Sequence, residues 1–410
     1  MFDALFTTTT EYKKLSHALS GKGACALFGL PASGRAQVYA ALCRQLDKPL
    51  CIVTPGEAEA TRFAADLNTL GIPAAVFPAR DYVLRPIEGT AREYEYRRLA
   101  VLGELVGGRL RAVAVPAEAL TQFTTPKEDF CANTRTLHAG DTLLRDDLLA
   151  ALFGAGYTRR AQVDGPGQFS VRGDIVDIFA PDQKMPVRME FWGDEIDTLH
   201  TFDLTTQRRE DAIDKFYLSP AREVLFGKPA DAAEQLRAFL AKQRGKKKTA
   251  MADCMAADLD LLDGGAVPVN MDKYLVVRYP HPATVLDYFY DPILVAEEPA
   301  SIREADRATA YRRGEELKSL ILDGVLCAGL DNLYADPSYL WSKTGHYRTI
   351  CAENFARSMP DQPLKDIINT PAHTLPAWNG EVAGLLEDLK PLCDAGYTVT
   401  LLAGTDHIAL

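Results

Sequence analysis

The chain has 410 residues, of which 47% are hydrophobic and 25% are charged, and its formal net charge is −11 at pH 7. This length and composition predict an ordinary globular protein of several domains. The negative charge disfavours a chain that wraps nucleic acid by itself, because binding to phosphates depends on Lys and Arg. No apolar run of about 18 residues is present, so we expect neither a transmembrane helix nor a membrane partner. The eight Cys form no CxxC pair and no zinc-ligand spacing, which predicts reduced thiols, no metal site and a cytoplasmic protein.

Buried-strand patterns and helical patterns alternate over the first 120 residues. Strands are expected at 23–31, 49–55, 74–78 and 110–120, and helices at 35–47, 56–71 and 90–106. Such alternation predicts a parallel sheet with helices packed on it. From about 213 to 340 the same alternation returns, and it includes a long charged helix from 299 to about 321.

Between these stretches the pattern changes to short, turn-rich segments of alternating polarity, from 157 to 209. This alternation indicates antiparallel strands. The simplest account is one α/β domain built from two chain segments, with a mainly antiparallel β module inserted between them. We place the first segment at 1–122, the module at 123–212, the second segment at 213–375 and the start of a further α/β domain at 376–410. One helix and one strand cannot bury their own apolar faces, so we expect the chain to be a piece of a longer protein.

The segment G29-L-P-A-S-G-R-A36 lies between an expected strand and an expected helix and has the outline of a phosphate-binding loop. A working loop reads GxxxxGK[ST]: backbone amides hold phosphate, Lys reaches the β and γ oxygens, and the hydroxyl binds Mg²⁺. Gly29 and Gly34 occupy the glycine positions, but Arg35 replaces the Lys and Ala36 replaces the hydroxyl residue. Arg35 can still contact an anion at a helix N-terminus. Ala36 cannot bind the metal that phosphoryl transfer needs, so we expect a P-loop-NTPase-like sheet whose phosphate loop is degenerate.

The second half of a nucleotide site would be a strand that ends in acidic residues. The segment I293-L-V-A-E-E298 places Glu297 and Glu298 at such a strand end, which is similar to a Walker B strand with Glu where Asp is usual. Two acids at a strand end are common, so this signal is weak by itself. We expect no catalytic residue and no cofactor in this chain.

The strand expected near 187–192 alternates apolar residues with Arg188, Glu190 and Trp192. One set faces the core of the module, which leaves Arg188 and Trp192 on the other side, roughly 13 Å apart. Arg172, in F-S-V-R-G-D, alternates with apolar neighbours in the same way. Two Arg with an exposed aromatic ring have the composition of a protein–protein contact.

A structural alternative stays open for these three residues. Arg172 can pair internally with Asp174 or Glu190, and Trp192 can simply cover the edge of the sheet. The residue pattern alone does not separate this interpretation from a binding surface.

Two groups of basic residues raise a further hypothesis, which is direct binding of duplex DNA. The run R-G-K-K-K at 244–248 is more simply a solvated loop between helices. A second group contains Arg92, Arg97, Arg98, Arg109 and Arg111. DNA binding through these residues would depend steeply on salt, and the net charge makes it at most a minor activity.

Four segments together resemble the UvrB-like N-terminal region of the bacterial transcription-repair coupling factors (Mfd). They are FPARDY (77–82), VRGDIVDIFAP (171–181), RMEFWGDEID (188–197) and VLDYFYDPILVAEEP (285–299), and the resemblance runs from about 20 to 405. UvrB proteins share the VRGD and EF-GDEI strands. Three departures favour the coupling factors over UvrB: the altered Arg35 and Ala36, no room after FPARDY for the long aromatic hairpin of UvrB, and a tail after 380 similar to a non-catalytic third domain.

The resemblance implies a helicase-type α/β domain and a non-catalytic adaptor. In both families the β module docks UvrA, and the contact positions fall on Arg172, Arg188 and Trp192, with Arg159 and Arg160 as a candidate extension. The resemblance further implies that RNA polymerase and damaged or duplex DNA are bound through C-terminal regions, that ATP and Mg²⁺ belong to a translocase motor there, and that a C-terminal domain covers the module. The alternative is a UvrB-related DNA-binding or NTPase module of nucleotide excision repair.

Overall fold

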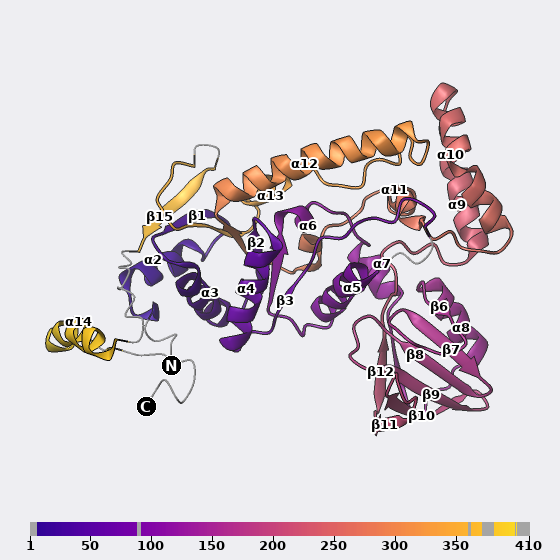
Figure 1. Cartoon of the computed structure of the whole chain (residues 1–410), viewed down its shortest axis with the longest axis horizontal. Helices are drawn as coiled ribbons and strands as arrows, with labels where there is room; N and C mark the ends of the chain where they lie inside the picture. The colour runs from indigo at the N-terminus through magenta and orange to yellow at the C-terminus, as the bar shows by residue number, and fades with distance from the viewer. Residues whose placement is uncertain (1–5, 88–91, 360–361, 371–380, 398, 400–410) are drawn as a thin grey trace. The chain divides into compact units, whose positions relative to one another are not determined.

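The computed structural model describes residues 6–87, 92–359, 362–370, 381–397 and 399, and Figure 1 shows the course of the chain. By its internal contacts the chain divides into two units, Met1–Thr370 and Pro371–Leu410. All the sheets described below belong to the first unit.

A seven-stranded parallel sheet organises the first unit (Figure 1). Its strands lie in the order β15 (Leu364–Asn369), β1 (Gly23–Phe28), β14 (Arg348–Glu353), β13 (Ile293–Glu297), β2 (Leu50–Thr54), β4 (Ala112–Pro116) and β3 (Ala74–Val76). Every pairing in it is parallel. Strands from both expected segments therefore hydrogen-bond side by side, which confirms an α/β domain built from two stretches of chain.

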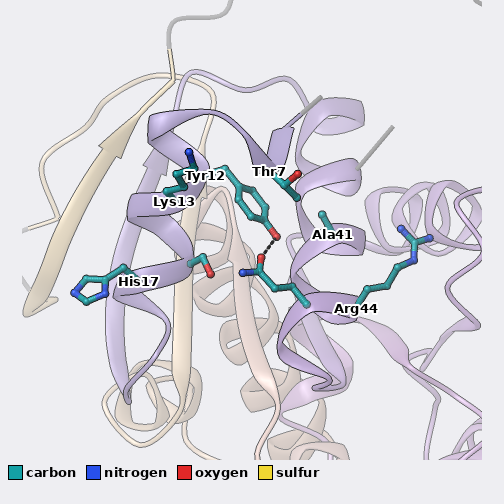
Figure 2. Close-up of a pocket in the computed structure, with 8 residues that line it drawn as sticks. Thr7, Tyr12, Lys13, His17, Ala41 and Arg44 are labelled. Carbon is teal, nitrogen blue, oxygen red and sulfur yellow. Dashed lines mark hydrogen bonds between the residues drawn. The ribbon is translucent and has the colours of Figure 1, made fainter. Parts of the chain in front are cut away.

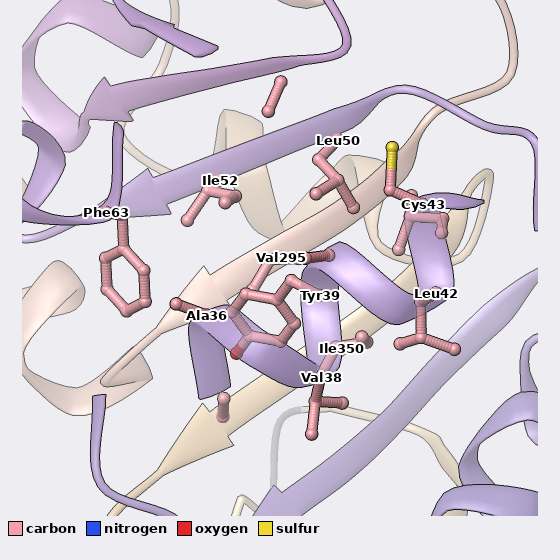
Figure 3. Packing of buried hydrophobic residues seen from close by; sticks show 14 of the residues in the cluster. Ala36, Val38, Tyr39, Leu42, Cys43, Leu50, Ile52, Phe63, Val295 and Ile350 are labelled. Carbon is pink, nitrogen blue, oxygen red and sulfur yellow. The ribbon is translucent and has the colours of Figure 1, made fainter. Parts of the chain in front are cut away.

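Helices cover both faces of this sheet. One face packs against α2 (Thr10–Ala18), α3 (Ala32–Leu46) and α4 (Glu57–Thr69), and the other against α5 (Glu93–Val106), α6 (Ala117–Leu120), α7 (Lys127–Ala132), η2 (Val285–Tyr288), α12 (Pro299–Leu322) and α13 (Tyr339–Lys343). Successive strand residues serve opposite faces, as the pleat requires. In β2, Leu50 and Ile52 join the first core, whereas Cys51 and Val53 join the second. Figure 3 shows the first core, where Tyr39 and Leu42 of α3 lie over the strands.

A third apolar core lies beside the sheet domain and is mostly helical. It draws on α9 (Pro229–Ala241), α10 (Gly245–Asp263), η1 (Met271–Tyr274), α11 (Leu275–Arg278) and the turn that follows α12. The basic run 244–248 was expected to be a loop, but Lys246, Lys247 and Lys248 form the first turn of α10. Lys has a good helix propensity, and the run is exposed as expected.

The C-terminal end of one expected strand needs a correction. The strand expected at 110–120 stops at Pro116, and the residues that follow form the short helix α6. The helix has the sequence A-E-A-L, which consists of strong helix formers.

The inserted module is a six-stranded sheet with a helix, α8 (Arg145–Gly154), packed on it. Its strand order is β11 (Arg209–Ala212), β10 (Glu195–Phe202), β9 (Val187–Trp192), β8 (Ile175–Phe179), β7 (Gln168–Arg172) and β6 (Thr158–Arg159). All pairings are antiparallel except that of β6 with β7, so the expectation of a mainly antiparallel module is confirmed. A separate two-stranded antiparallel sheet pairs β5 (Arg135–His138) with β12 (Lys215–Leu218).

The range 123–212 that we expected for the module remains a prediction. Its apolar core extends further along the chain, because Phe216, Leu218 and Ala221 belong to it.

The second unit contains the amphipathic helix α14 (Val382–Asp394). The strand expected after this helix lies outside the described residues. Among the residues that the structure describes, no helix is long and apolar enough to span a membrane.

A buried network of charges ties the β module to the sheet domain. Arg98 of α5 makes two hydrogen bonds to Glu223, on the segment that returns from the module, with N···O distances of 2.7 and 3.1 Å. Arg80 makes the same kind of contact with Asp272 of η1, at 2.7 and 3.2 Å, and its Nε lies 3.0 Å from Glu223. Neither Arg98 nor Glu223 is exposed to solvent. Because water does not reach these two side chains, they are stabilised by the opposite charges around them and by hydrogen bonds from Arg98 to Pro78 and Gln122.

Glu95 of α5 completes this network by accepting a hydrogen bond from the backbone N–H of Glu223 at 2.9 Å. Burial by itself would raise the pKa of Glu95, but Arg80, Arg222 and Arg92 lower it to about 2. The carboxylate is thus held in its charged form, which keeps the network intact at neutral pH.

Replacement of Arg98 with Met tests this network. The variant leaves the Glu223 carboxylate buried without its bidentate partner, and the loss of one partner of a buried ion pair costs about 3–5 kcal/mol of unfolding free energy. Arg97→Met is the control, because Arg97 is exposed and lies 3.7 Å from Glu57, an arrangement worth at most about 1 kcal/mol. Urea unfolding measures both, and equal losses in the two variants would contradict the assignment.

Candidate functional site

One face of the module's sheet carries the residues that the sequence analysis selected for partner binding. Asp177 of β8 lies directly opposite Arg188 of β9 and opposite Ser170 of β7. Arg172 lies two residues beyond Ser170, so its side chain projects from the same face. The intervening residues, among them Val176 and Met189, fill the core on the opposite face.

Asp177 binds both arginines of this face. Its carboxylate accepts hydrogen bonds from Nε and NH2 of Arg188 at 2.7 and 3.0 Å and from NH2 of Arg172 at 2.6 Å. Asp177 itself is only 1% exposed. The sequence analysis offered Asp174 or Glu190 as the internal partner of Arg172, but these carboxylates face Arg145 and Arg209 instead. The sequence pattern does not identify Asp177 as the shared partner of the two arginines.

The two arginines differ in how much of them a partner can reach. Arg188 is 8% exposed, its NH1 donates to the backbone oxygen of Gln207 at 3.1 Å, and its guanidinium lies 4.7 Å from the centre of the Phe202 ring. Arg172 has 46% of its side chain exposed. Trp192 is 83% exposed, so it does not cover the sheet edge. Of the three residues proposed for partner binding, Arg172 and Trp192 are therefore the two whose side chains a partner can reach.

Two turns of the same type bring these residues to one end of the sheet. Arg172 pairs with Ile175 around Gly173–Asp174, and Trp192 pairs with Glu195 around Gly193–Asp194. Gly173 and Gly193 have φ values of 61° and 63°, which two-residue hairpin turns require and which favour glycine. Strands β7 and β9 run in the same direction because each is antiparallel to β8. The docking end, defined as Arg172, Trp192 and these two turns, is thus a single region.

Arg159 and Arg160 were a candidate extension of the patch. Both are exposed, but they line a cavity of about 1250 Å³ together with Phe153 and Lys228, and neither Arg172 nor Trp192 lines it. The structure therefore does not bring these two arginines together with the docking end.

The degenerate loop is closed by its own surroundings. Helix α3 begins at Ala32, so Gly34, Arg35 and Ala36 are already helical. The backbone N–H of Thr370, which follows β15, donates to the carbonyl of Phe28 at 2.9 Å. Gly29 has a φ of 89°, and a side chain there would clash with the carbonyl oxygen of Thr370. The residue that follows β15 therefore packs directly against the start of the degenerate loop.

Arg35 is paired with the two acidic residues of the strand end. It is 2% exposed, its NH2 lies 3.1 Å from Glu297 and its NH1 lies 2.9 Å from Glu298. Glu297 also accepts a hydrogen bond from the Tyr39 hydroxyl at 2.5 Å. This geometry does not favour the contact with an anion that the sequence left open for Arg35, because its guanidinium is paired with the two carboxylates. The basic residue of the loop and the two acidic residues of the strand end are thus paired with one another.

The arginines proposed for DNA binding also have acidic partners. Arg98 is buried against Glu223, and the others pair with carboxylates as follows: Arg92 with Glu95 (2.8 Å), Arg97 with Glu57 (3.7 Å), Arg109 with Asp182 (3.6 Å) and Arg111 with Asp47 (2.8 Å). Their charges are compensated within the chain, which leaves little net positive potential for phosphates.

A separate surface pocket of about 580 Å³ lies between α2 and α3 (Figure 2). In this pocket the Tyr12 hydroxyl donates a hydrogen bond to the side-chain oxygen of Gln45 at 2.6 Å. Polar groups of Lys13, His17 and Arg44 also line it. None of the residues predicted for partner binding or for the degenerate loop lines this pocket.

The charge state of Glu297 makes the paired cluster testable. Burial raises the pKa of Glu297 to about 7 from its ordinary value of 4.5, against the opposing effects of Arg35 and Tyr39. Between these values the folded state keeps a proton that the unfolded state releases. The residue's contribution to the unfolding free energy is therefore full below about pH 4.5 and is lost as the pH rises through about 7.

Glu297→Gln should remove that dependence, which amounts to about 3 kcal/mol across the window. Urea unfolding at several pH values measures it. Glu304→Gln serves as the control, because Glu304 is exposed on the neighbouring helix α12 and should keep the wild-type slope. An unchanged slope in Glu297→Gln would show that its carboxyl does not titrate in this window.

Comparison with known proteins points to one group. Residues 136–224 match the model of the UvrB interaction domain family. The transcription-repair-coupling factor of Bacillus subtilis (strain 168) is 25% identical over 387 residues, which covers 92% of this chain and 33% of that protein. The factor of Myxococcus xanthus is 35% identical over 208 residues, covering 48% of this chain and 17% of that protein. That of Staphylococcus haemolyticus (strain JCSC1435) is 24% identical, with coverage of 92% and 33%.

The chain thus spans about a third of the length of the curated relatives that it matches over most of its own length. The docking end lies inside the matched domain, since Arg172 and Trp192 fall within 136–224. The chain is therefore similar to the transcription-repair-coupling factors over most of its length, and its residues 136–224 match the UvrB interaction domain family.

Proposed function

We propose that this chain is an adaptor whose β module docks UvrA through the docking end. The observation that carries the proposal is the exposure of Arg172 and Trp192 at one end of the sheet, inside the segment that matches the UvrB interaction domain. Exposed Arg and Trp side chains are the residue types that dominate protein–protein binding energies. Asp177 supports the arrangement because it fixes the direction of the Arg172 guanidinium before a partner arrives, which lowers the entropy lost on binding.

Arg188 has a different role in this proposal. It is held by Asp177, Gln207 and Phe202, and little of it is exposed. We assign it to positioning, since it neutralises the second oxygen of Asp177 and supports the face on which Arg172 lies. Replacement of Arg188 would disturb the module itself, so loss of binding in such a variant would not identify a contact.

The relatives' name joins transcription to repair, and this chain spans about a third of their length. We extend the proposal to the whole protein: it recruits UvrA to RNA polymerase stalled at DNA damage. This proposal assigns neither contacts with polymerase nor ATP-driven translocation on DNA to the residues of this chain.

We also propose that this chain does not hydrolyse ATP. The support is the pairing of Arg35 with Glu297 and Glu298 and the absence of a hydroxyl at Ala36. Calorimetry with ATP and Mg²⁺ should give no heat of binding, and phosphate release should stay at background. Turnover that disappears in Glu297→Gln would overturn this part of the proposal.

Binding to UvrA tests the adaptor directly. Arg172→Ala and Trp192→Ala should each weaken binding by roughly 30-fold, the effect of removing a residue worth about 2 kcal/mol. Arg237→Ala on α9 is the matched control: its side chain is 51% exposed and paired with Asp263, much as Arg172 is paired with Asp177, but it lies outside the module. The measurement is the Kd by surface plasmon resonance, and full-strength binding by both module variants would refute the site.

A further inference from the structure

Two cysteines that the docking function does not use lie together in the third core. Cys254 is on α10, and Cys327 is in the turn that follows α12. The Cys254 sulfur lies 3.1 Å from the backbone oxygen of Val325, two residues before Cys327, and each of the two thiols shifts the pKa of the other.

The turn is held against α10 by more than the sulfur atoms. A methyl group added at Gly329 would lie 3.4 Å from the end of the Met251 side chain and 3.0 Å from the Lys247 ammonium. Residues 247, 251 and 254 recur at intervals of four and three, so they line one side of the helix. The turn therefore lies along this side, and the approach of the two cysteines is a consequence of packing.

The surroundings make the two thiols unequal. The hydrogen bond from Cys327 lowers the pKa of Cys254 to about 7, with burial opposing and Lys273 assisting. The same hydrogen bond and burial raise the pKa of Cys327. Lys273 is itself buried, and its ammonium lies 2.6 Å from Asp258 and 3.1 Å from the backbone oxygen of Cys254.

Access also differs between them. Cys254 is half-buried, whereas Cys327 is buried. A thiolate that a small molecule can reach, next to a second thiol, is the arrangement of an attacking and a resolving cysteine. Among the remaining cysteines, Cys25, Cys43, Cys51 and Cys351 are buried with pKa values raised by burial, and Cys131 and Cys393 are exposed.

We propose that Cys254 and Cys327 form a thiol–disulfide exchange site, which a low-molecular-weight disulfide oxidises to an intramolecular disulfide. The Cys254 thiolate attacks one sulfur of the small disulfide, forms a mixed disulfide and releases one thiolate. Cys327 then loses its proton and attacks the Cys254 sulfur, which releases the second thiolate. The two protein thiols are oxidised by two electrons, and the small disulfide is reduced to two thiols.

The new bond would join α10 covalently to the turn after α12, two elements that non-covalent contacts hold together in the reduced protein. Cross-links of this kind restrict the unfolded chain, so the oxidised protein should unfold at a higher temperature. The docking end belongs to the β module, whose apolar core is separate from the third core. This inference therefore does not depend on the proposed adaptor function.

The test is incubation of the whole chain with oxidised glutathione, followed by mass spectrometry. We expect a loss of about 2 Da, from the two hydrogens removed, and a linked pair of peptides that contain Cys254 and Cys327. Cys327→Ser should stop at a glutathione adduct on Cys254, and Cys254→Ser should form no linked pair. The matched control, Cys131→Ser with Cys393→Ser, removes the two exposed thiols and should cross-link like the wild type.

Peptide mapping of the wild-type protein keeps the test independent of how the variants fold. Adducts confined to Cys131 and Cys393, with Cys254 unmodified, would overturn the proposal. A stable glutathione adduct on Cys254 that Cys327 does not resolve would overturn it as well.

Discussion

The pairing of Arg98 with Glu223, inside the network that also contains Arg80 and Asp272, is the interaction on which the arrangement of the first unit depends. It connects a helix of the parallel sheet to the segment on which the chain returns from the β module. Buried charges of this kind tolerate only one geometry, because each loses its solvation and must recover it from a fixed partner. The insertion of a separate module into the sheet domain is therefore anchored at its exit.

The same physics operates at two other places with opposite consequences. Arg35 is paired with Glu297 and Glu298, so its positive charge is compensated inside the fold. The degenerate loop therefore retains only the backbone shape of a phosphate-binding loop. At the docking end, Asp177 shares its charge between Arg188 and Arg172, and the second of these stays half exposed. Internal pairing thus leaves Arg35 buried, whereas it orients an arginine at the docking end that remains accessible. The difference between the two places is the exposed fraction of the arginine side chain.

Much of this was accessible from the sequence. The alternation of strands and helices predicted the parallel sheet, and the alternation around Arg188 placed the apolar residues in the core, because both patterns follow directly from backbone geometry.

The partner of Arg172 could not be predicted from the sequence. The Gly173–Asp174 turn fixes the register of β7 with β8, but the longer connection before β9 leaves open which residue of β8 faces Arg188, and only the folded sheet shows that it is Asp177. The contacts of Arg35 join residues 263 positions apart, a separation at which a local pattern carries no information.

The central claim is that one end of the module's sheet is the surface that UvrA covers. Hydrogen–deuterium exchange of this chain, with and without UvrA, tests it most directly. The account predicts that protection appears at the Gly173–Asp174 and Gly193–Asp194 turns and in the adjoining ends of β7 and β9, while α3 and α10 exchange as in the free chain. Protection confined to the parallel-sheet domain, with the two turns unchanged, would contradict it.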